Sequence, residues 1–230
     1  MGVIEKIVNH VRGQARGKRA RIFAENYSVT SETRVIDIGS EDGSAISRVL
    51  AGTSVKPQNV FIADINEAFV KAGQAQYGFT PVVIPESGTL PFPDQFFDIV
   101  YCSSVIEHVT IPKAEVWAVR SAQEFKEKAL ERQTVFAREI RRLGKAYFVQ
   151  TPNRWFPVES HTWLPFVGYL PRQVLIPLLR FTNSVWIKRT TPDWYLLTTR
   201  DMRKYFPDAV IKRERFFGLT KSLMAIKILR

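Results

Sequence analysis

The sequence predicts an α/β protein built around a mostly parallel β-sheet, and two observations carry this prediction. Five short segments are almost continuously apolar, so both faces of these strands are expected to be buried. Segments with helical periodicity separate them, which is typical of chains that build parallel sheets. The 230 residues, 45% hydrophobic and 24% charged, suffice for one domain with a core that needs neither disulfide nor metal. The expected strands are residues 34–38, 59–64, 81–84, 97–102 and 146–150.

Helical periodicity begins at the start of the chain. Ile4, Ile7, Val8 and Val11 recur at the i, i+3, i+4, i+7 spacing of one helical face. A later, strongly charged segment fits one or two amphipathic helices. The expected helices are residues 3–26, 45–50, 67–76, 113–143 and 199–205.

The last third of the chain departs from this alternation. Residues 151–199 contain six prolines and four of the five tryptophans, which indicates an insertion rather than another strand–helix unit. After it, two strands over residues 209–216 and 222–229, with a turn at Gly218-Leu219 and the neighbouring residues, are expected to form a hairpin at one edge of the sheet.

The net charge of +11 is concentrated at the two ends of the chain. Residues 1–21 hold six Lys or Arg and one Glu, residues 22–162 hold fourteen against seventeen acidic residues, and residues 163–230 hold thirteen against four. Basic ends suggest contact with phosphate, in nucleic acid, anionic lipid or a phosphorylated substrate, and a merely solvated face is the alternative. The most apolar stretch is broken by three prolines and two arginines, so no transmembrane span is expected. Without a targeting signal, a cytoplasmic protein is expected.

Cysteine and histidine usage limits the metal chemistry. A single cysteine, Cys102, excludes an internal disulfide and a cysteine-built zinc site. His10, His108 and His161 are too far apart for a local metal motif, which leaves only a long-range site, and no metal is predicted.

Residues 35–43, Val-Ile-Asp-Ile-Gly-Ser-Glu-Asp-Gly, lead from an expected strand through a glycine loop into a helix. Such a loop lets the backbone approach a ligand at the carboxyl end of the sheet. It matches neither phosphate-binding fingerprint, and Glu41 and Asp42 would repel pyrophosphate. A cationic or neutral nucleoside ligand is therefore favoured. Asp64, at the end of the second strand, is placed to accept two hydrogen bonds from a ribose.

Two further motifs complete a family resemblance. Residues 90–100 read Leu-Pro-Phe-Pro-Asp-Gln-Phe-Phe-Asp-Ile-Val, and residues 104–109 read Ser-Val-Ile-Glu-His-Val. With the glycine loop and Asp64, they make roughly residues 30–155 similar to class I S-adenosylmethionine-dependent methyltransferases, in particular the type 11-like branch of small-molecule, ubiquinone and lipid methyltransferases. The resemblance implies S-adenosylmethionine as cofactor and a Rossmann-like, doubly wound, seven-stranded and mostly parallel sheet with an antiparallel terminal strand and a lid insertion.

The domain organisation that we expect is a single methyltransferase domain over the whole chain. Its parts are a basic N-terminal helix (1–26), a cofactor-binding core (27–150), a lid and acceptor insertion (151–199) and a C-terminal helix with a strand hairpin (200–230).

The resemblance also assigns cofactor contacts to matching positions. It implies Asp37 and Gly39 at the methionine end, Gly43 where the helix packs closely, and Asp64 on the ribose. Glu86 falls where the family usually has an Asp near the adenine amino group, and the end of the fourth strand should pass the sulfonium. The expected cofactor-binding residues are Asp37, Gly39, Ser40, Gly43, Asp64, Ile65, Glu86, Ser87, Cys102 and Ser103.

Two positions depart from the family pattern. Glu41 replaces the middle glycine of the loop, where it could crowd the cofactor. Residues 142–145, Arg-Leu-Gly-Lys, replace the usual Lys-Pro-Gly-Gly turn before the fifth strand. The first departure keeps a non-catalytic cofactor-binding domain as an alternative.

Methyl transfer to a hydroxyl requires alignment in a dry site and removal of the proton by a base with a pKa near 7. His161 follows the fifth strand and His108 the fourth, so both are expected at the ligand-binding end of the sheet. His161, with Glu159 to orient its ring, is the first candidate for the base, and His108 is the second. Helix capping or packing by His108, and loop hydrogen bonding by His161, are the structural alternatives.

The sequence thus predicts methyl transfer from S-adenosylmethionine to oxygen, or in second place to carbon or nitrogen, of a small-molecule or lipid-like acceptor. Aromatic and basic residues interleave in the insertion, which predicts a lid that docks on an anionic membrane surface. A lid packed wholly on its own domain is the alternative. A nucleic-acid methyltransferase also fits the charge, but Cys102-Ser103-Ser104 does not match the Asn/Asp-Pro-Pro-aromatic turn of nucleobase amino methylases.

Overall fold

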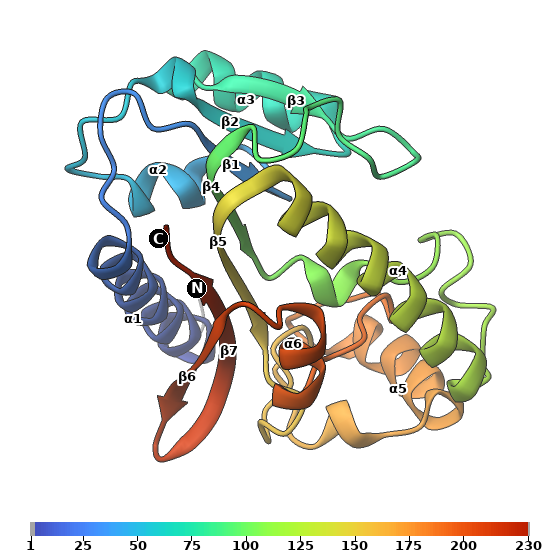
Figure 1. Cartoon of the computed structure of the whole chain (residues 1–230). Coiled ribbons are helices and arrows are strands. Elements are labelled where there is room, and N and C mark those ends of the chain that lie inside the picture. The colour runs from blue at the N-terminus through green and yellow to red at the C-terminus, as the bar shows by residue number, and fades with distance from the viewer. Residues whose placement is uncertain (1–2, 230) are drawn as a thin grey trace. The chain divides into compact units, whose positions relative to one another are not determined.

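The computed structural model describes the backbone of residues 3–229 and the side chains of residues 13–229, and it confirms the predicted α/β class. The strands of this part of the chain form one sheet in the order β3-β2-β1-β4-β5-β7-β6 (Figure 1). The pairs β1–β2, β1–β4 and β2–β3 are parallel, and β6–β7 is antiparallel, as predicted. The strands are β1 Val35–Ile38, β2 Val60–Asp64, β3 Thr80–Val83, β4 Phe97–Ser103, β5 Gly144–Pro152, β6 Val210–Phe216 and β7 Leu219–Lys227. The helices are α1 Val3–Asn26, α2 Ser44–Val49, α3 Glu67–Tyr77, α4 Ala122–Leu143, α5 Arg172–Val185 and α6 Thr199–Tyr205, with short 3₁₀ segments η1 Pro57–Asn59, η2 Ile106–His108 and η3 Val167–Tyr169.

The chain divides into two compact units. Of the described residues, the first unit holds 3–101, 143–148 and 228–229, with α1 to α3 and β1 to β3. The second unit holds residues 102–142 and 149–227, with most of α4, all of α5 and α6, and the β6–β7 hairpin. Strands β4 and β5 begin in the first unit and end in the second.

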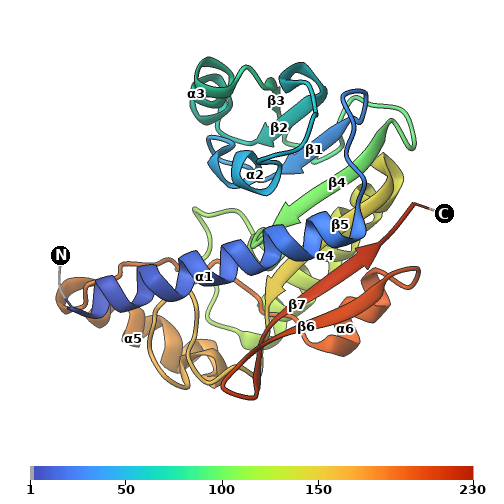
Figure 2. The same cartoon turned by 90° about the vertical axis from the view of Figure 1, so that its left-hand side faces the viewer.

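The first unit is organised around β1, all of whose residues are buried. Helix α3 packs on β2 and β3, and Figure 2 shows α2 and α3 beside these strands. The long helix α1 is anchored by its C-terminal turn. The buried Phe23 ring lies 5.8 Å from that of Tyr101 and 6.1 Å from that of Phe148. The Tyr27 hydroxyl donates a hydrogen bond of 2.6 Å to the Tyr147 carbonyl. The apolar face predicted for residues 4–11 lies outside the described side chains.

The second unit contains the predicted C-terminal hairpin. Its register runs from Val210 opposite Ile226 to Phe216 opposite Leu219. Phe217 and Gly218 connect the strands with φ angles of 46° and 78°. A two-residue hairpin turn of type I′ requires positive φ at both central positions. The predicted hairpin is therefore confirmed. Its turn is formed by Phe217 and Gly218, one residue earlier than the predicted Gly218-Leu219.

Helix α4 is shorter than predicted. It begins at Ala122, whereas residues 113–118 form turns and residues 119–121 are irregular, so the helical register expected for Val116 and Val119 is wrong. The cause is a tertiary contact. The guanidinium group of Arg172 donates hydrogen bonds to the carbonyl oxygens of Val116 and Val119, the second at 2.9 Å, and to that of Pro192 at 2.8 Å. Carbonyl groups bound in this way do not need the amide partners of a continued helix.

The insertion 151–199 contains a helix that the sequence pattern did not predict. Helix α5 continues through Pro177, although a proline inside a helix removes one backbone hydrogen bond. Leu175 and Leu179 of this helix are buried in a cluster with Val167, Trp194 and Leu196. Burial of these side chains offsets the lost hydrogen bond. Among the described helices, none has both the length and the apolar composition needed to cross a bilayer.

Candidate active site

The glycine loop of the first unit has the conformation that its glycines predict. Gly39 and Gly43 both have a φ of 74°, in the left-handed region that favours glycine. The amide of Gly39 donates to the Ala63 carbonyl at 2.7 Å, which joins the loop to the end of β2. A Cβ atom on Gly43 would lie 3.1 Å from the Ile62 side chain and 3.2 Å from that of Phe79. Gly43 therefore allows the start of α2 to pack closely on the strand.

Glu41 occupies the loop position where the family pattern has glycine. Its φ is 51°, so a non-glycine residue adopts a left-handed conformation here. Its side chain is exposed, and its amide donates to Oδ2 of Asp64 at 3.0 Å. The second carboxylate oxygen of Asp64 accepts the amide of Asn66 at 2.9 Å. Two backbone hydrogen bonds thus fix Asp64, and each of its oxygens keeps a lone pair for a ligand.

Asp37 is a buried carboxyl group at the end of β1. Its Oδ2 atom has no hydrogen-bond partner among the residues that the structure describes. Burial, together with the negative charges of Asp64 and Glu41, raises the pKa of Asp37 to about 8. A buried acceptor without a partner is uncommon, because it forfeits the hydrogen bonds that water would supply. The ends of β1 and β2 therefore form an acidic site that suits a cation.

The other cofactor residues expected in the first unit follow the ends of β2 and β3. Ile65 comes directly after Asp64 and is 69% exposed, so it presents a free apolar surface. Glu86 and Ser87 lie in the exposed loop after β3. The Ile84 amide donates to the Asp64 carbonyl at 2.9 Å, which holds the start of this loop to the end of β2. The Ser40 side chain is buried in the glycine loop.

Cys102 and Ser103, the remaining expected cofactor residues, belong to the second unit at the end of β4. Cys102 is fully buried. The hydroxyls of Ser103 and Ser104 donate to Oε1 of Gln150 on β5, at 2.7 and 3.0 Å. Ser104 has a φ of 61°, so the chain turns sharply where the strand ends.

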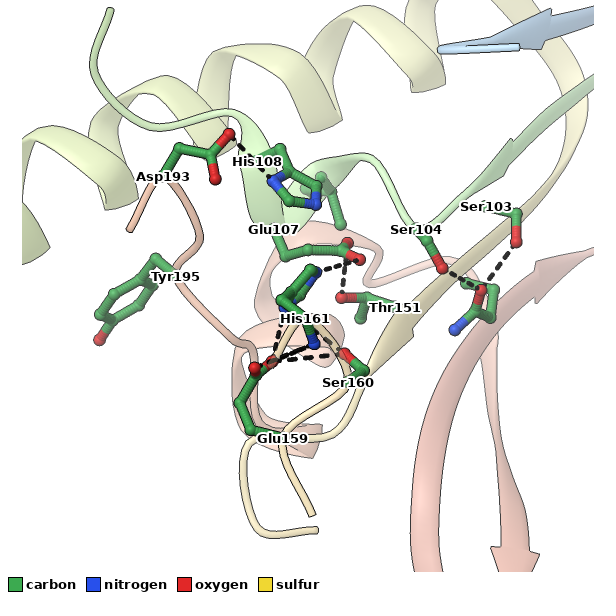
Figure 3. Close-up of polar contacts among 12 residues, drawn as sticks. Ser103, Ser104, Glu107, His108, Thr151, Glu159, Ser160, His161, Asp193 and Tyr195 are labelled. Atoms are coloured by element: carbon green, nitrogen blue, oxygen red, sulfur yellow. Dashed lines mark hydrogen bonds and ion pairs between the residues drawn. The ribbon is translucent and has the colours of Figure 1, made fainter. Parts of the chain in front are cut away.

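The partly buried His161 contacts the buried Glu159 (Figure 3). The His161 Nδ1 atom lies 2.5 Å from Glu159 Oε1, and its ring stacks on Trp194 with centroids 5.4 Å apart. The backbone amides of His161 and Thr162 also donate to the Glu159 carboxylate. Burial raises the pKa of Glu159, but the hydrogen bonds and charge of His161, with these amides, outweigh burial and lower the pKa below its ordinary value. Glu159 is therefore ionised and holds the loop that carries His161.

Residues from η2 complete this cluster, which contains Glu107, His108, Glu159, His161 and Asp193. The rings of His108 and His161 lie 4.6 Å apart at an interplanar angle of 87°. The His108 Nδ1 atom lies 3.4 Å from Asp193 Oδ2. Burial lowers the pKa of His108, but the hydrogen bond to Asp193 and the charges of Glu107 and Asp193 outweigh burial and raise the pKa above its ordinary value.

Long-range hydrogen bonds position η2. The Glu107 carbonyl accepts the amide of Tyr195 at 2.7 Å. The Gln133 side chain on α4 donates to the carbonyls of Ile106 and Tyr195, both at 3.0 Å. These contacts place η2 beside the segment that carries Asp193. The histidine cluster therefore combines three segments that are distant in the sequence.

Comparisons with known proteins identify the family. A family model for a methyltransferase domain matches residues 36–145. The ubiquinone/menaquinone biosynthesis C-methyltransferase UbiE of Cupriavidus taiwanensis is 27% identical over 205 residues, which cover 85% of this chain and 74% of that protein. These matches support a class I S-adenosylmethionine-dependent methyltransferase, with residues 36–145 as the matched domain.

Solved structures agree with the methyltransferase in fold. Magnesium protoporphyrin IX methyltransferase from Synechocystis PCC 6803, with bound SAH, has a TM-score of 0.53 at 15% identity. The aligned region covers 99% of this chain and 88% of that protein. An S-adenosylmethionine-dependent methyltransferase from Mesorhizobium loti has a TM-score of 0.51 at 11% identity, over 91% and 95% of the two chains. At such identities the likeness shows the fold alone.

S-adenosylmethionine is the cofactor of the methyltransferase, and the residues of the first unit fit it chemically. When bound, this cofactor supplies a methyl group on an activated, positively charged sulfonium. The unpartnered Oδ2 of Asp37 and the neighbouring carboxylates of Asp64 and Glu41 match a ligand with cationic sulfonium and amino groups. The Glu41 side chain is exposed rather than buried in the loop, so it does not occupy the space that the cofactor needs.

Sequence reasoning missed three residues that shape these sites. A Cβ atom on Gly73 of α3 would lie 2.4 Å from the Ile62 side chain and 2.5 Å from the Asp42 carbonyl oxygen. Its only sequence signal is a small residue on the buried side of the helix. Glu107 stood in the family motif but received no role, and nothing near Asp193 in the sequence indicated its contact with His108.

Proposed function

We propose that the methyltransferase transfers the methyl group to a hydroxyl oxygen of a small-molecule or lipid-like acceptor, with His161 as the base. The observation that carries this proposal is the contact between His161 Nδ1 and the ionised Glu159. A carboxylate at Nδ1 accepts the proton on that atom, so the lone pair of the neutral ring is on Nε2. Nε2 is then the atom that receives the acceptor's proton. Glu159 orients the ring and stabilises its positive charge after transfer.

For the cofactor, we propose that Asp37 and Gly39 hold the methionine end and that the Asp64 carboxylate accepts hydrogen bonds from the two ribose hydroxyls. The exposed Ile65 supplies an apolar face for adenine, and the Glu86 carboxylate accepts a hydrogen bond from the adenine amino group. Ser40, Gly43 and Ser87 shape the backbone around the nucleoside, and Cys102 and Ser103 pass the sulfonium. Methyl transfer requires that the acceptor oxygen and the sulfonium methyl group be aligned in line.

Replacing His161 with Ala tests the base. Turnover should fall by roughly 10²- to 10⁴-fold, the usual contribution of a general base, whereas the dissociation constant of S-adenosylmethionine, measured by calorimetry, should stay within about twofold. Glu131→Gln, at an exposed position of α4, is the matched control and should behave as the unchanged chain. Equal losses of turnover and of cofactor affinity in His161→Ala would contradict the proposal.

The name of the Cupriavidus relative, a C-methyltransferase, supports methylation at carbon as the second candidate. A screen with isotopically labelled S-adenosylmethionine against lipid, small-molecule and RNA fractions identifies the acceptor class. The carbon chemical shift of the new methyl group then separates an O-methyl from a C-methyl product. Label in RNA alone would replace the small-molecule proposal with a nucleic-acid methyltransferase.

We also propose that the acceptor-side insertion docks on an anionic membrane. Val174, Phe181 and Val185 lie on one face of α5 and are 51%, 65% and 65% exposed. The segment 163–230 that contains this helix holds thirteen basic and four acidic residues. Apolar rings beside cations are typical of interfacial helices. Phe181→Asp should reduce co-sedimentation with vesicles that contain phosphatidylserine, whereas Phe217→Asp, at the 91% exposed hairpin turn, should not. Equal loss in both variants, or no binding to these vesicles, would refute docking.

A further inference from the structure

Three side chains of the histidine cluster converge on one point, although they come from two distant segments (Figure 3). One ligand atom each from Glu107, His108 and His161 lies within 4.8 Å of the others. The Nε2 atom of His161 is 4.0 Å from Oε1 of Glu107. We propose that these residues bind one divalent transition-metal ion of the zinc class. Two imidazoles and one carboxylate are a ligand set found in catalytic zinc sites.

The state of Glu107 is the second observation in favour of an ion. Its side chain is fully buried. Oε2 accepts a hydrogen bond of 3.0 Å from the Thr151 hydroxyl, but Oε1 has no hydrogen-bond partner in the part of the chain that the structure describes. His161 Nε2, at 4.0 Å, is too far for a hydrogen bond. A buried carboxylate oxygen left alone is strongly destabilising, and a cation at this point removes the deficit.

The contacts around both imidazoles match those of metal-binding histidines. Nδ1 of His161 contacts Glu159, and Nδ1 of His108 faces Asp193, so Nε2 of each ring remains for the ion. Asp193 in turn accepts the Thr191 hydroxyl at 2.9 Å. Carboxylates at the outer nitrogen fix the tautomer and the ring orientation of metal ligands. Both histidines therefore have the outer partner that such a site requires.

One of the three ligands, His108, borders an open hollow, and the ligand set leaves room for a further ligand. An open hollow of about 400 Å³ adjoins His108 and is lined by Asn183, Arg189, Thr190, Thr191 and Asp193. Three protein ligands leave at least one position for water or for the acceptor. Ligand atoms of a tetrahedral zinc ion lie roughly 3.4 Å apart. The ligand atoms of the three side chains must therefore approach one another by up to about 1.4 Å when the ion binds.

A catalytic role for the ion rests on the proposed function, whereas binding of the ion does not. The acceptor would bind the ion through its hydroxyl oxygen, which makes loss of the proton to water easier. The oxygen then forms the bond to the methyl carbon, the sulfur–methyl bond breaks, and sulfur keeps the electron pair as a neutral thioether. Because Nε2 of His161 is a ligand when the ion is bound, the role of His161 as base in the proposed function applies to the metal-free protein, and in the metal-loaded protein the ion would activate the hydroxyl.

Binding of Zn²⁺ and Co²⁺ to the full chain, after removal of metal with a chelator, tests the site. Equilibrium dialysis should find one ion per chain, and Co²⁺ should give visible absorption bands of a nitrogen- and oxygen-ligated ion. Glu107→Gln keeps the shape and the Thr151 contact but removes the ligand charge, so its affinity should fall by about 100-fold. His161→Ala and His108→Ala should lose the Co²⁺ bands. Glu159→Gln, which changes only an outer partner, should weaken binding by roughly 10- to 100-fold.

Glu131→Gln is the matched control and should bind one ion with the affinity of the unchanged chain. Thermal unfolding with and without Zn²⁺ shows whether each variant is folded, and Glu107→Gln keeps the test valid if a histidine variant fails to fold. Equal ion binding by the unchanged chain and Glu107→Gln would overturn the site. Stoichiometric binding without methylation of any hydroxyl would instead overturn the proposed O-methylation and leave the metal site standing.

Discussion

The raised pKa of Asp37 predicts that S-adenosylmethionine binding depends strongly on pH. Burial and the charges of Asp64 and Glu41 raise this pKa to about 8, so the free protein holds Asp37 mostly protonated at neutral pH. A cationic ligand binds the ionised carboxylate, and the proton must leave when it binds. The apparent dissociation constant should therefore fall by roughly fifty-fold between pH 6 and pH 8 and change little above pH 9.

Calorimetry in two buffers with different heats of protonation measures the released proton directly. At pH 7 a group with a pKa near 8 is about nine-tenths protonated, so close to one proton should be released per cofactor bound. Asp37→Asn provides the comparison, because the amino group of S-adenosylmethionine titrates equally with both proteins. The variant should bind more weakly at pH 8 and should release nearly one proton less. Identical pH dependence in the two proteins would refute the assignment of Asp37 to the cationic end of the cofactor.

The same shift fixes the sign of the stability effect. The pKa of Asp37 in the folded protein lies above its ordinary value of 3.8. The favourable contribution of the neutral form is thus fully present below about pH 4 and is lost progressively as the pH rises to about 8. Free protein should lose stability to urea over this interval, and Asp37→Asn should reduce the loss.

Three substitutions test the packing around the two sites. Glu41→Gly should raise the free energy of unfolding by about 1 kcal/mol, because glycine removes the left-handed strain, and Glu41→Ala should give no comparable gain in urea denaturation. Gly73→Ala should lower the free energy of unfolding by about 1–3 kcal/mol and weaken cofactor binding, because the added carbon meets Ile62 and the glycine loop. The control Gly17→Ala, whose added carbon meets nothing within 4 Å, should not destabilise the protein. Arg172→Lys should lower the free energy of unfolding by about 3 kcal/mol. An ammonium group cannot bind three carbonyls and stack on Phe125 as the guanidinium group does. An unchanged midpoint of urea denaturation would contradict this prediction.

Local pattern was sufficient for the cofactor-binding half of the fold. The continuous apolar runs became β1 to β5, and the glycine loop has the positive φ angles that its glycines predicted. These features depend on backbone sterics and on burial of neighbouring residues, which short segments encode. The start of α4 could not be found in this way, because the carbonyls of Val116 and Val119 bind Arg172, more than fifty residues further on.

The insertion and the histidine cluster required the structure. The prolines in 151–199 indicated an insertion in which no helix was expected, but α5 forms around Pro177 because its buried face packs into the cluster with Val167, Trp194 and Leu196. The sequence left only a long-range metal site, and the fold brings His108 and His161 to ring centroids 4.6 Å apart. The pair Glu159–His161 was predictable, since only Ser160 separates its members in the sequence. Asp193 was not, because its contact with His108 spans more than eighty residues.

The distribution of charge in the chain supports a cationic ligand at each of two buried carboxyl groups, Asp37 and Glu107. The protein carries 33 basic and 22 acidic residues, so cations are abundant for pairing. Even so, neither Asp37 nor Glu107 has a Lys or Arg partner among the described residues, and each buries one carboxylate oxygen with no hydrogen bond. Acidic groups buried without a protein cation are destabilising unless a ligand compensates them. In the first unit the cofactor's sulfonium and amino groups supply that charge. For Glu107, a divalent ion held together with His108 and His161 supplies that charge.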